Sequence, residues 1–167
     1  MNKIIIYSRK NIVFSSHLRF FCTRYSKSHE WVRMLEKGNL ATIGISSFSS
    51  SFIGKLDTVK LETEVNSHYK SNDPIGIVGS INSIKEVHTP ISGKCIEMNH
   101  EIVKEPNLID ESPERKGWLI KIEVDDHKTF NKLMTREQYQ KYLNDEVGGN
   151  FITSKNNIGD SETIILG

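Results

Sequence analysis

The sequence lacks the short motifs by which many enzymes are recognised. It contains no GxGxxG or GxxxxGK[ST] phosphate-binding loop, no GxSxG nucleophile turn and no HExxH zinc motif. Its histidines are scattered without metal-ligand spacing, and the acidic pairs Glu62 with Glu64 and Asp125 with Asp126 are typical of solvated faces. We therefore expect a protein without a catalytic or metal site of its own.

Cysteine, net charge and long apolar runs are also scarce. Of only two cysteines, Cys22 lies near the N-terminus, so a domain that starts after it holds Cys95 alone and no internal disulfide. The 22 basic and 21 acidic residues nearly cancel, and basic residues do not interleave with aromatic ones. The longest early apolar run, residues 4–7, is far too short to span a membrane. Neither nucleic acid nor a membrane is expected as a partner.

Acidic residues are missing from the start of the chain, where Glu30 is the first. Serines, apolar residues and basic residues precede it, and residues 1–24 hold five of the basic ones: Lys3, Arg9, Lys10, Arg19 and Arg24. A stretch of this kind is typical of an organellar transit peptide. We predict such a leader at residues 1–24, cleaved near residues 21–25, and a mitochondrial matrix protein. A disordered basic arm is the alternative.

The rest of the chain reads mostly as short strands. Strands are expected at 40–45, 56–61, 74–78, 86–93, 95–99 and 118–124. In the last of these, Trp118, Ile120, Ile122 and Val124 alternate with Leu119, Lys121 and Glu123, which predicts one buried and one mostly wet face. The pattern favours a small, mostly β domain, either a sandwich or a barrel.

Helical signals are few and short. Phe48 and Phe52 behind Ser47, with Gly54 beyond, predict one or two capped turns, and Pro106 should end another short helix. Thr135 and Gln138 form a capping box that starts a C-terminal helix. After that helix the pattern is lost, and we predict a disordered or loosely attached tail at residues 147–167.

Four stretches of the sequence resemble the H protein of the glycine cleavage system, a family of lipoyl carriers. They are "YSKSHEWV" (25–32), "TIGIS" (42–46), "GSINSIKEVHTPISG" (79–93) and "EPNLIDESPERKGWLIKI" (105–122). The resemblance implies a hammerhead-like barrel-sandwich hybrid at residues 25–146, with short helices and a C-terminal helix. It also implies a non-catalytic carrier whose partners are the P, T and L proteins.

In that family a lysine at a hairpin tip is linked to lipoate, which takes an aminomethyl group from the P protein and presents it to the T protein. The family's tip reads E-S-V-K-A-x-S-[DE]-[IL]-Y-x-P-[VIL]-S-G. Aligned on Pro90–Gly93 without a gap, this chain has Gly79 at the glutamate and Asn82 at the lysine. The amide nitrogen of asparagine is conjugated with its own carbonyl and is not a nucleophile. Asn82 is therefore predicted to be unmodified and lipoate to be absent.

Two alternatives remain open. "SIK" (83–85) imitates the family's S-V-K, so a slipped register would bring Lys85 near the tip as a lipoylation site, although an odd shift turns alternate side chains to the wrong face. The other alternative is a non-carrying paralogue that binds and modulates the P, T or L protein or a lipoate-attaching enzyme. The presence of asparagine at position 82 is explained most simply by the turn itself, since asparagine tolerates a left-handed backbone conformation and forms hydrogen bonds with nearby backbone groups.

Overall fold

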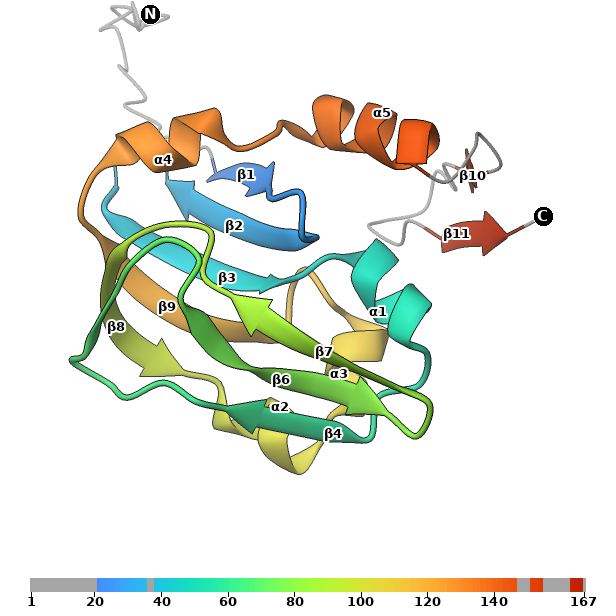
Figure 1. Ribbon diagram of the computed structural model, residues 1–167, viewed down its shortest axis with the longest axis horizontal. Helices are drawn as coiled ribbons and strands as arrows, with labels where there is room; N and C mark the ends of the chain where they lie inside the picture. The colour runs from blue at the N-terminus through green and yellow to red at the C-terminus, as the bar shows by residue number, and fades with distance from the viewer. Residues whose placement is uncertain (1–20, 36–37, 147–150, 155–162, 167) are drawn as a thin grey trace, which may run out of the picture.

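The computed structural model describes residues 21–35, 38–146, 151–154 and 163–166 (Figure 1). Two antiparallel sheets form its body. The larger sheet has the order β1 (Phe21–Tyr25), β2 (Glu30–Leu35), β3 (Leu40–Ile45), β9 (Trp118–Val124), β8 (Gly93–Met98) and β5 (His68–Tyr69). The smaller sheet has the order β4 (Thr58–Leu61), β6 (Pro74–Ser80) and β7 (Ser83–His88).

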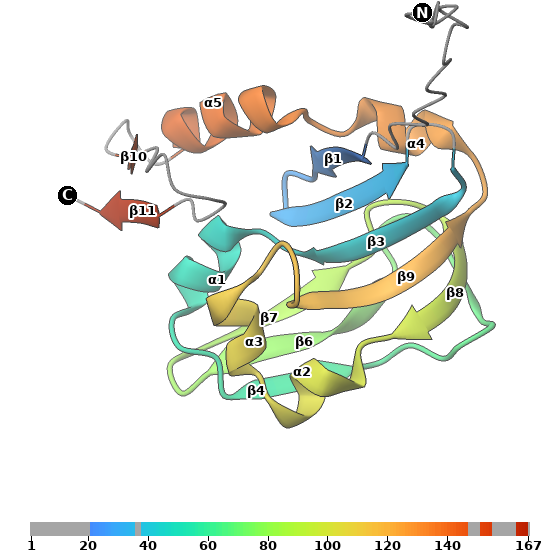
Figure 2. The same cartoon turned by 180° about the vertical axis from the view of Figure 1, so that it is seen from behind.

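Short helices lie around these sheets (Figure 2). They are α1 (Ser47–Ile53), α2 (His100–Lys104), α3 (Asn107–Glu111), α4 (His127–Lys132) and α5 (Arg136–Glu146). Within the described part of the chain, none is long and apolar enough to cross a membrane. The longest, α5, runs along β1, where the ring of Tyr139 stacks on that of Tyr25 at a centroid distance of 4.4 Å.

The main core lies between the two sheets. Val32, Ile43 and Ile120 from the larger sheet and Val78 and Val87 from the smaller one belong to a single buried cluster. Alternation along each strand turns these residues to the same interior, because successive side chains point to opposite faces. The mostly β barrel-sandwich architecture with short helices and a C-terminal helix is thus confirmed.

The helix caps predicted for α1 and α5 are both present, but the N-cap of α1 is one residue earlier than predicted. The backbone N–H of Thr135 donates to Oε1 of Gln138 at 2.9 Å, and that of Gln138 donates to Oγ1 of Thr135 at 3.2 Å, which completes the capping box. At α1 the N-cap is Ser46, not Ser47, and its Oγ accepts from the N–H of Ser49. Ser46 is the N-cap because β3 ends at Ile45 and the extended backbone continues through Ser46, as an N-cap residue requires.

Strand β9 differs from its predicted pattern at two residues. Ile120, Ile122 and Val124 are buried as expected, but Trp118 is only half-buried, and Leu119, predicted on the wet face, is fully buried in the same core cluster as Ile120. The register between β3 and β9 shifts here, since Ile43 pairs with Ile120 and Gly44 with Trp118, so the strict alternation of side chains is interrupted at Leu119.

The two ends of the chain are described only in part. Strand β1 begins at Phe21, inside the predicted leader, and pairs with β2, while residues 1–20 lie outside the described residues. In the tail, β10 (Phe151–Ser154) pairs with β11 (Thr163–Leu166), and residues 147–150, 155–162 and 167 lie outside. The leader and the disordered tail both stay predictions. Cys22 and Cys95 are free thiols.

Candidate functional site at the β6–β7 hairpin

The candidate site is the hairpin that joins β6 to β7. Its register pairs Val78 with Lys85, Gly79 with Ile84 and Ser80 with Ser83. Only Ile81 and Asn82 remain between the strands, so they form a two-residue turn, the commonest hairpin connection. The expected position of Asn82 at the tip is therefore observed, and Lys85 lies three residues down the returning strand.

Asn82 is exposed, and its backbone does not explain the choice of residue. Non-glycine residues with positive φ in the described part of the chain are His29, Asn66 and Asn72, and Asn82 is not among them. The turn thus makes no use of the tolerance of asparagine for left-handed backbone, which is a correction to the expectation from sequence. The N–H of Asn82 lies 3.4 Å from Oγ of Ser80, a weak contact. A lysine would meet no backbone strain at this position.

The tip is supported from behind by helix α1. Oγ of Ser80 donates a hydrogen bond of 2.7 Å to the carbonyl oxygen of Ile53, the last residue of that helix. The helix is fixed in turn by Asp110 of α3, whose carboxylate accepts from Oγ of Ser50 and from the N–H of Leu56, both at 2.8 Å. These hydrogen bonds fix the end of the hairpin to α1 and α1 to α3, so the turn is held in place.

Lys85 points back into the molecule instead of toward the tip. Its side chain is only 22% exposed, and it pairs across the strands with the buried Val78. Its ammonium group donates to the carbonyl oxygen of Ser28 and lies 3.6 Å from Oε1 of Glu30. Burial lowers the pKa of Lys85, and the nearby Glu30 carboxylate opposes part of that decrease.

Glu30, at the start of β2, is almost completely buried and is held by two hydroxyl groups. Oγ of Ser26 and Oγ of Ser28 each donate to its Oε2 at 2.5 Å. Its other oxygen, Oε1, has no hydrogen-bond partner among the described residues and faces the ammonium of Lys85. Sequence reasoning did not single out Ser26, Ser28 or Glu30 as site residues. The available signal was that the first acidic residue of the chain stands directly before an apolar strand.

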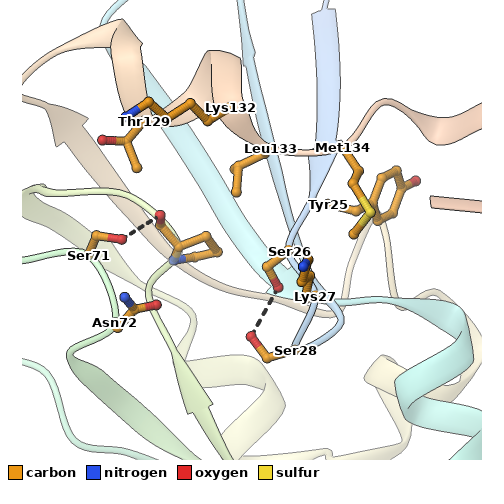
Figure 3. Close-up of a pocket in the computed structure, with 11 residues that line it drawn as sticks. Tyr25, Ser26, Lys27, Ser28, Ser71, Asn72, Thr129, Lys132, Leu133 and Met134 are labelled. Atoms are coloured by element: carbon orange, nitrogen blue, oxygen red, sulfur yellow. Dashed lines mark hydrogen bonds between the residues drawn. The ribbon is translucent and has the colours of Figure 1, made fainter. Parts of the chain in front are cut away.

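A pocket lies beyond the same loop, between the Ser26–Ser28 stretch and the end of α4 (Figure 3). It has a volume of about 290 Å³, and residues that line it include Ser26, Ser71, Asn72, Leu133 and Met134. Neither Asn82 nor Lys85 lines it, so the pocket is separate from the hairpin tip. Across the described residues, no three His, Cys, Asp or Glu side chains gather as a metal site.

The residues at the tip do not fit attachment of lipoate. Amide formation needs a free, solvent-accessible amine, and the side chains of the turn are an isoleucine and an amide. The nearest amine along the returning strand belongs to Lys85, which is half-buried and paired with Glu30.

Comparison with known proteins gives one consistent family. A family model described as Glycine cleavage H-protein matches residues 23–146. The glycine cleavage system H protein of Anoxybacillus flavithermus is 40% identical over 74% of this chain and 94% of its own length. That of Bacillus cytotoxicus is 37% identical over the same shares. A crystal structure of a glycine cleavage system H protein from Mycobacterium marinum has the same fold, with a TM-score of 0.64, 24% identity, and coverage of 75% of this chain and 96% of that one.

Proposed function

Because the chain belongs to the glycine cleavage H-protein family, we propose that it is a mitochondrial member that keeps the carrier fold but carries no lipoyl group. H proteins of this family are carriers and not catalysts. The proposed role is docking on the P, T or L protein of the glycine cleavage system, without transfer of an aminomethyl group. The support comes from the tip of the hairpin.

One observation carries the proposal: the tip residue is Asn82. Its exposed position at a two-residue turn is where a carrier would present an amine, and asparagine offers only a conjugated, non-nucleophilic amide. The neighbouring change supports the same conclusion, because Gly79 removes the acidic residue that the family has three positions before its lysine. Two substitutions within four residues remove both the acceptor and part of its surroundings.

The main rival is a working carrier that uses Lys85. Three features argue against it: the register is not slipped, the side chain is 22% exposed, and its ammonium group is engaged with Ser28 and Glu30. To reach an attaching enzyme, Lys85 would have to leave a buried carboxylate without its counter-charge, which is costly. We therefore favour the non-carrying function.

The decisive measurement is the intact mass of the protein after incubation with a lipoate-attaching enzyme and activated lipoate. The expected result is an unchanged mass, while an H protein with a lysine at its tip gains one lipoyl group in the same reaction. Lys85→Arg serves as the matched variant, because it keeps the charge and removes the amine nucleophile. A lipoyl adduct that is present in the starting protein and absent from Lys85→Arg would establish the rival.

The docking role has its own test in a reconstituted glycine decarboxylation assay. Excess of this chain should slow the reaction of P protein with a lipoylated H protein, because both compete for one surface. The rate should recover as more lipoylated H protein is added. An unchanged rate at large excess, repeated with T and L protein assays, would contradict docking without affecting the conclusion about lipoylation.

A further inference from the structure

The pocket between the loop after β1 and the end of α4 is lined by charges of one sign (Figure 3). Lys27 comes from the loop and Lys132 is the last residue of α4, and the described residues that line the pocket include no aspartate or glutamate. Neither lysine forms an ion pair or a side-chain hydrogen bond with another described residue. Because charges of one sign around a concave surface concentrate their field inside it, the pocket favours a negatively charged ligand.

The pocket also holds polar side chains that are still able to donate hydrogen bonds. Its serine hydroxyls already donate to protein groups, those of Ser26 and Ser28 to Glu30 and that of Ser71 to the carbonyl oxygen of Pro90. The side chains of Asn72 and Thr129, by contrast, form no hydrogen bond with any described residue. With the two lysines they supply donors from the loop after β1, the loop before β6 and α4, which border the pocket on different sides (Figure 3).

Negative charge close to the pocket limits how much charge the ligand carries. The Glu30 carboxylate lies behind two of the serines, but it faces the ammonium group of Lys85. Asp73 is the neighbour of Asn72 in sequence, does not line the pocket, and accepts a hydrogen bond of 2.7 Å from the N–H of Lys70. The end of α4 at the pocket is its C-terminal end, which carries partial negative charge. A singly charged anion is therefore favoured over a doubly charged phosphate monoester.

The remaining lining is apolar and sets the body of the ligand. It consists of Leu133 and Met134 just after α4, the Tyr25 side chain and Pro90. The volume of about 290 Å³ is near the lower limit of small-molecule sites, which begin at about 300 Å³. At about 30 Å³ for each water-sized group, the pocket holds roughly ten non-hydrogen atoms. A short aliphatic chain fits this size and gains from contact with the apolar wall.

We propose that this pocket binds a small monocarboxylate with a short aliphatic chain. The carboxylate is bound by Lys27 and Lys132, and Asn72 and Thr129 donate further hydrogen bonds to it. The chain packs against Leu133 and Met134. An amine of the same size would meet two like charges here. The proposal does not rest on the proposed function, because the pocket is separate from the hairpin tip.

The site is tested by NMR titration of the isotope-labelled full chain with sodium hexanoate at neutral pH. The backbone amide signals of Lys27, Asn72, Thr129 and Lys132 should shift and saturate with a Kd of about 1 mM, a moderate affinity that suits so small a ligand. Inorganic phosphate and hexylamine are the comparison probes. Each should bind about tenfold more weakly or worse, phosphate because it has no chain and hexylamine because its charge is positive.

Lys132→Met is the informative variant, because it removes the charge and keeps most of the length of the side chain. It should weaken hexanoate binding by about tenfold. The matched control is Lys128→Met, which is exposed on the same helix but does not line the pocket, and its Kd should be unchanged. Lys27→Met repeats the test on a different segment of the chain, so the result does not depend on how α4 tolerates its substitution.

Shifts that are confined to the pocket, saturate in the starting protein and in Lys128→Met, and weaken in the Lys27 and Lys132 variants support the proposal. Shifts that do not saturate overturn it, as does an unchanged Kd in both of those variants. Hexylamine or phosphate binding as tightly as hexanoate also overturns it, because the charge or the chain of the ligand would then not matter. The lipoylation and docking measurements use none of these probes, so a failure here leaves the proposed function unaffected.

Discussion

The ammonium nitrogen of Lys85 lies 3.6 Å from Oε1 of Glu30, a buried carboxylate oxygen that no hydrogen bond satisfies among the described residues. Lys85 is on β7 of the smaller sheet and Glu30 begins β2 of the larger one, so the pair ties the returning strand of the hairpin to the opposite sheet. An uncompensated buried charge is far more costly than an exposed one. The pair therefore contributes to stability and also keeps the Lys85 amine mostly out of solvent.

The first prediction concerns this pair. Lys85→Met should lower the free energy of unfolding by about 3 kcal/mol, because it leaves the Glu30 carboxylate buried without a counter-charge. Glu30→Gln in the same chain should restore part of the loss. Urea unfolding measures both variants. The control is Lys60→Met, since Lys60 lies only 2.7 Å from Glu62 but is 69% exposed, and such pairs contribute about 1 kcal/mol or less. Equal losses at positions 60 and 85 would contradict the argument.

The second prediction concerns pH and His29. Burial and the charge of Lys85 lower the pKa of His29 below its usual 6.5, although Glu146 and Glu30 oppose the change, and its Nδ1 is 2.9 Å from the hydroxyl of Tyr139. The unfolded chain then binds a proton more readily than the folded one. Stability from this group is complete above pH 6.5 and is lost as the pH falls toward the lower folded pKa.

His29→Asn is the informative variant for that dependence. His29 has a positive φ of 71°, which asparagine tolerates, so the backbone should be retained. The unfolding free energy of the starting protein should decrease between pH 7 and pH 5, and the variant should show a smaller decrease. NMR titration of the His29 ring should give a pKa below 6.5. A ring that titrates above that value would reverse the sign and refute the assignment.

The third prediction tests two adjacent buried residues of β9, Leu119 and Ile120. Ile120→Ala should cost about 2–5 kcal/mol, as expected for a fully buried aliphatic side chain, and Leu119→Ala should cost a similar amount. Glu123→Ala on the same strand is exposed and should change stability by about 0.5 kcal/mol or less. A loss at Ile120 as small as that at Glu123 would mean that the core face is misassigned.

Leu119 also shows where sequence reasoning stops. Alternation along β9 predicts the burial of Ile120, Ile122 and Val124, because strand geometry fixes it locally, but the burial of Leu119 follows from the register shift between β3 and β9. The Lys85–Glu30 pair also could not be predicted from local sequence. The two residues are far apart in the chain, and only the packing of the smaller sheet on the larger one brings them together. By contrast, the capping box and the position of Asn82 at the turn are set by neighbours in sequence, and both were predicted.

The fourth prediction concerns the leader. A reporter fused behind residues 1–23 should enter mitochondria, because this stretch is basic and has no acidic residue. The matched control carries Arg9→Glu and Arg19→Glu, which reverse charge without changing length, and should stay in the cytosol. Mitochondrial import of both fusions would show that the basic pattern is not the targeting signal, and a cytosolic starting fusion would remove the proposed location.

The last prediction asks whether Asn82 alone separates this chain from a carrier. Asn82→Lys adds an amine at an exposed turn position without a positive φ, so it should be accepted without strain. Gly79→Glu restores the family's acidic residue, and its Cβ would lie 3.3 Å from Cγ1 of Ile84 and 3.3 Å from the carbonyl oxygen of Ser83. The exposed Ile84 side chain can relieve the first contact, and a backbone shift of a few tenths of an ångström at the turn can relieve the second. The double variant should therefore fold and gain one lipoyl group from a lipoate-attaching enzyme, as measured by intact mass and peptide mapping.

Ser83→Lys with Gly79→Glu is the control, because its amine is one residue past the tip and faces the opposite side of the strand. Modification of the double variant alone would mean that the surrounding hairpin still meets the requirements of the attaching enzyme. A folded double variant that stays unmodified would mean that Ile84, Lys85 or the uncharged surface of α1 also blocks recognition, and the loss of the carrier role would then extend beyond the tip residue.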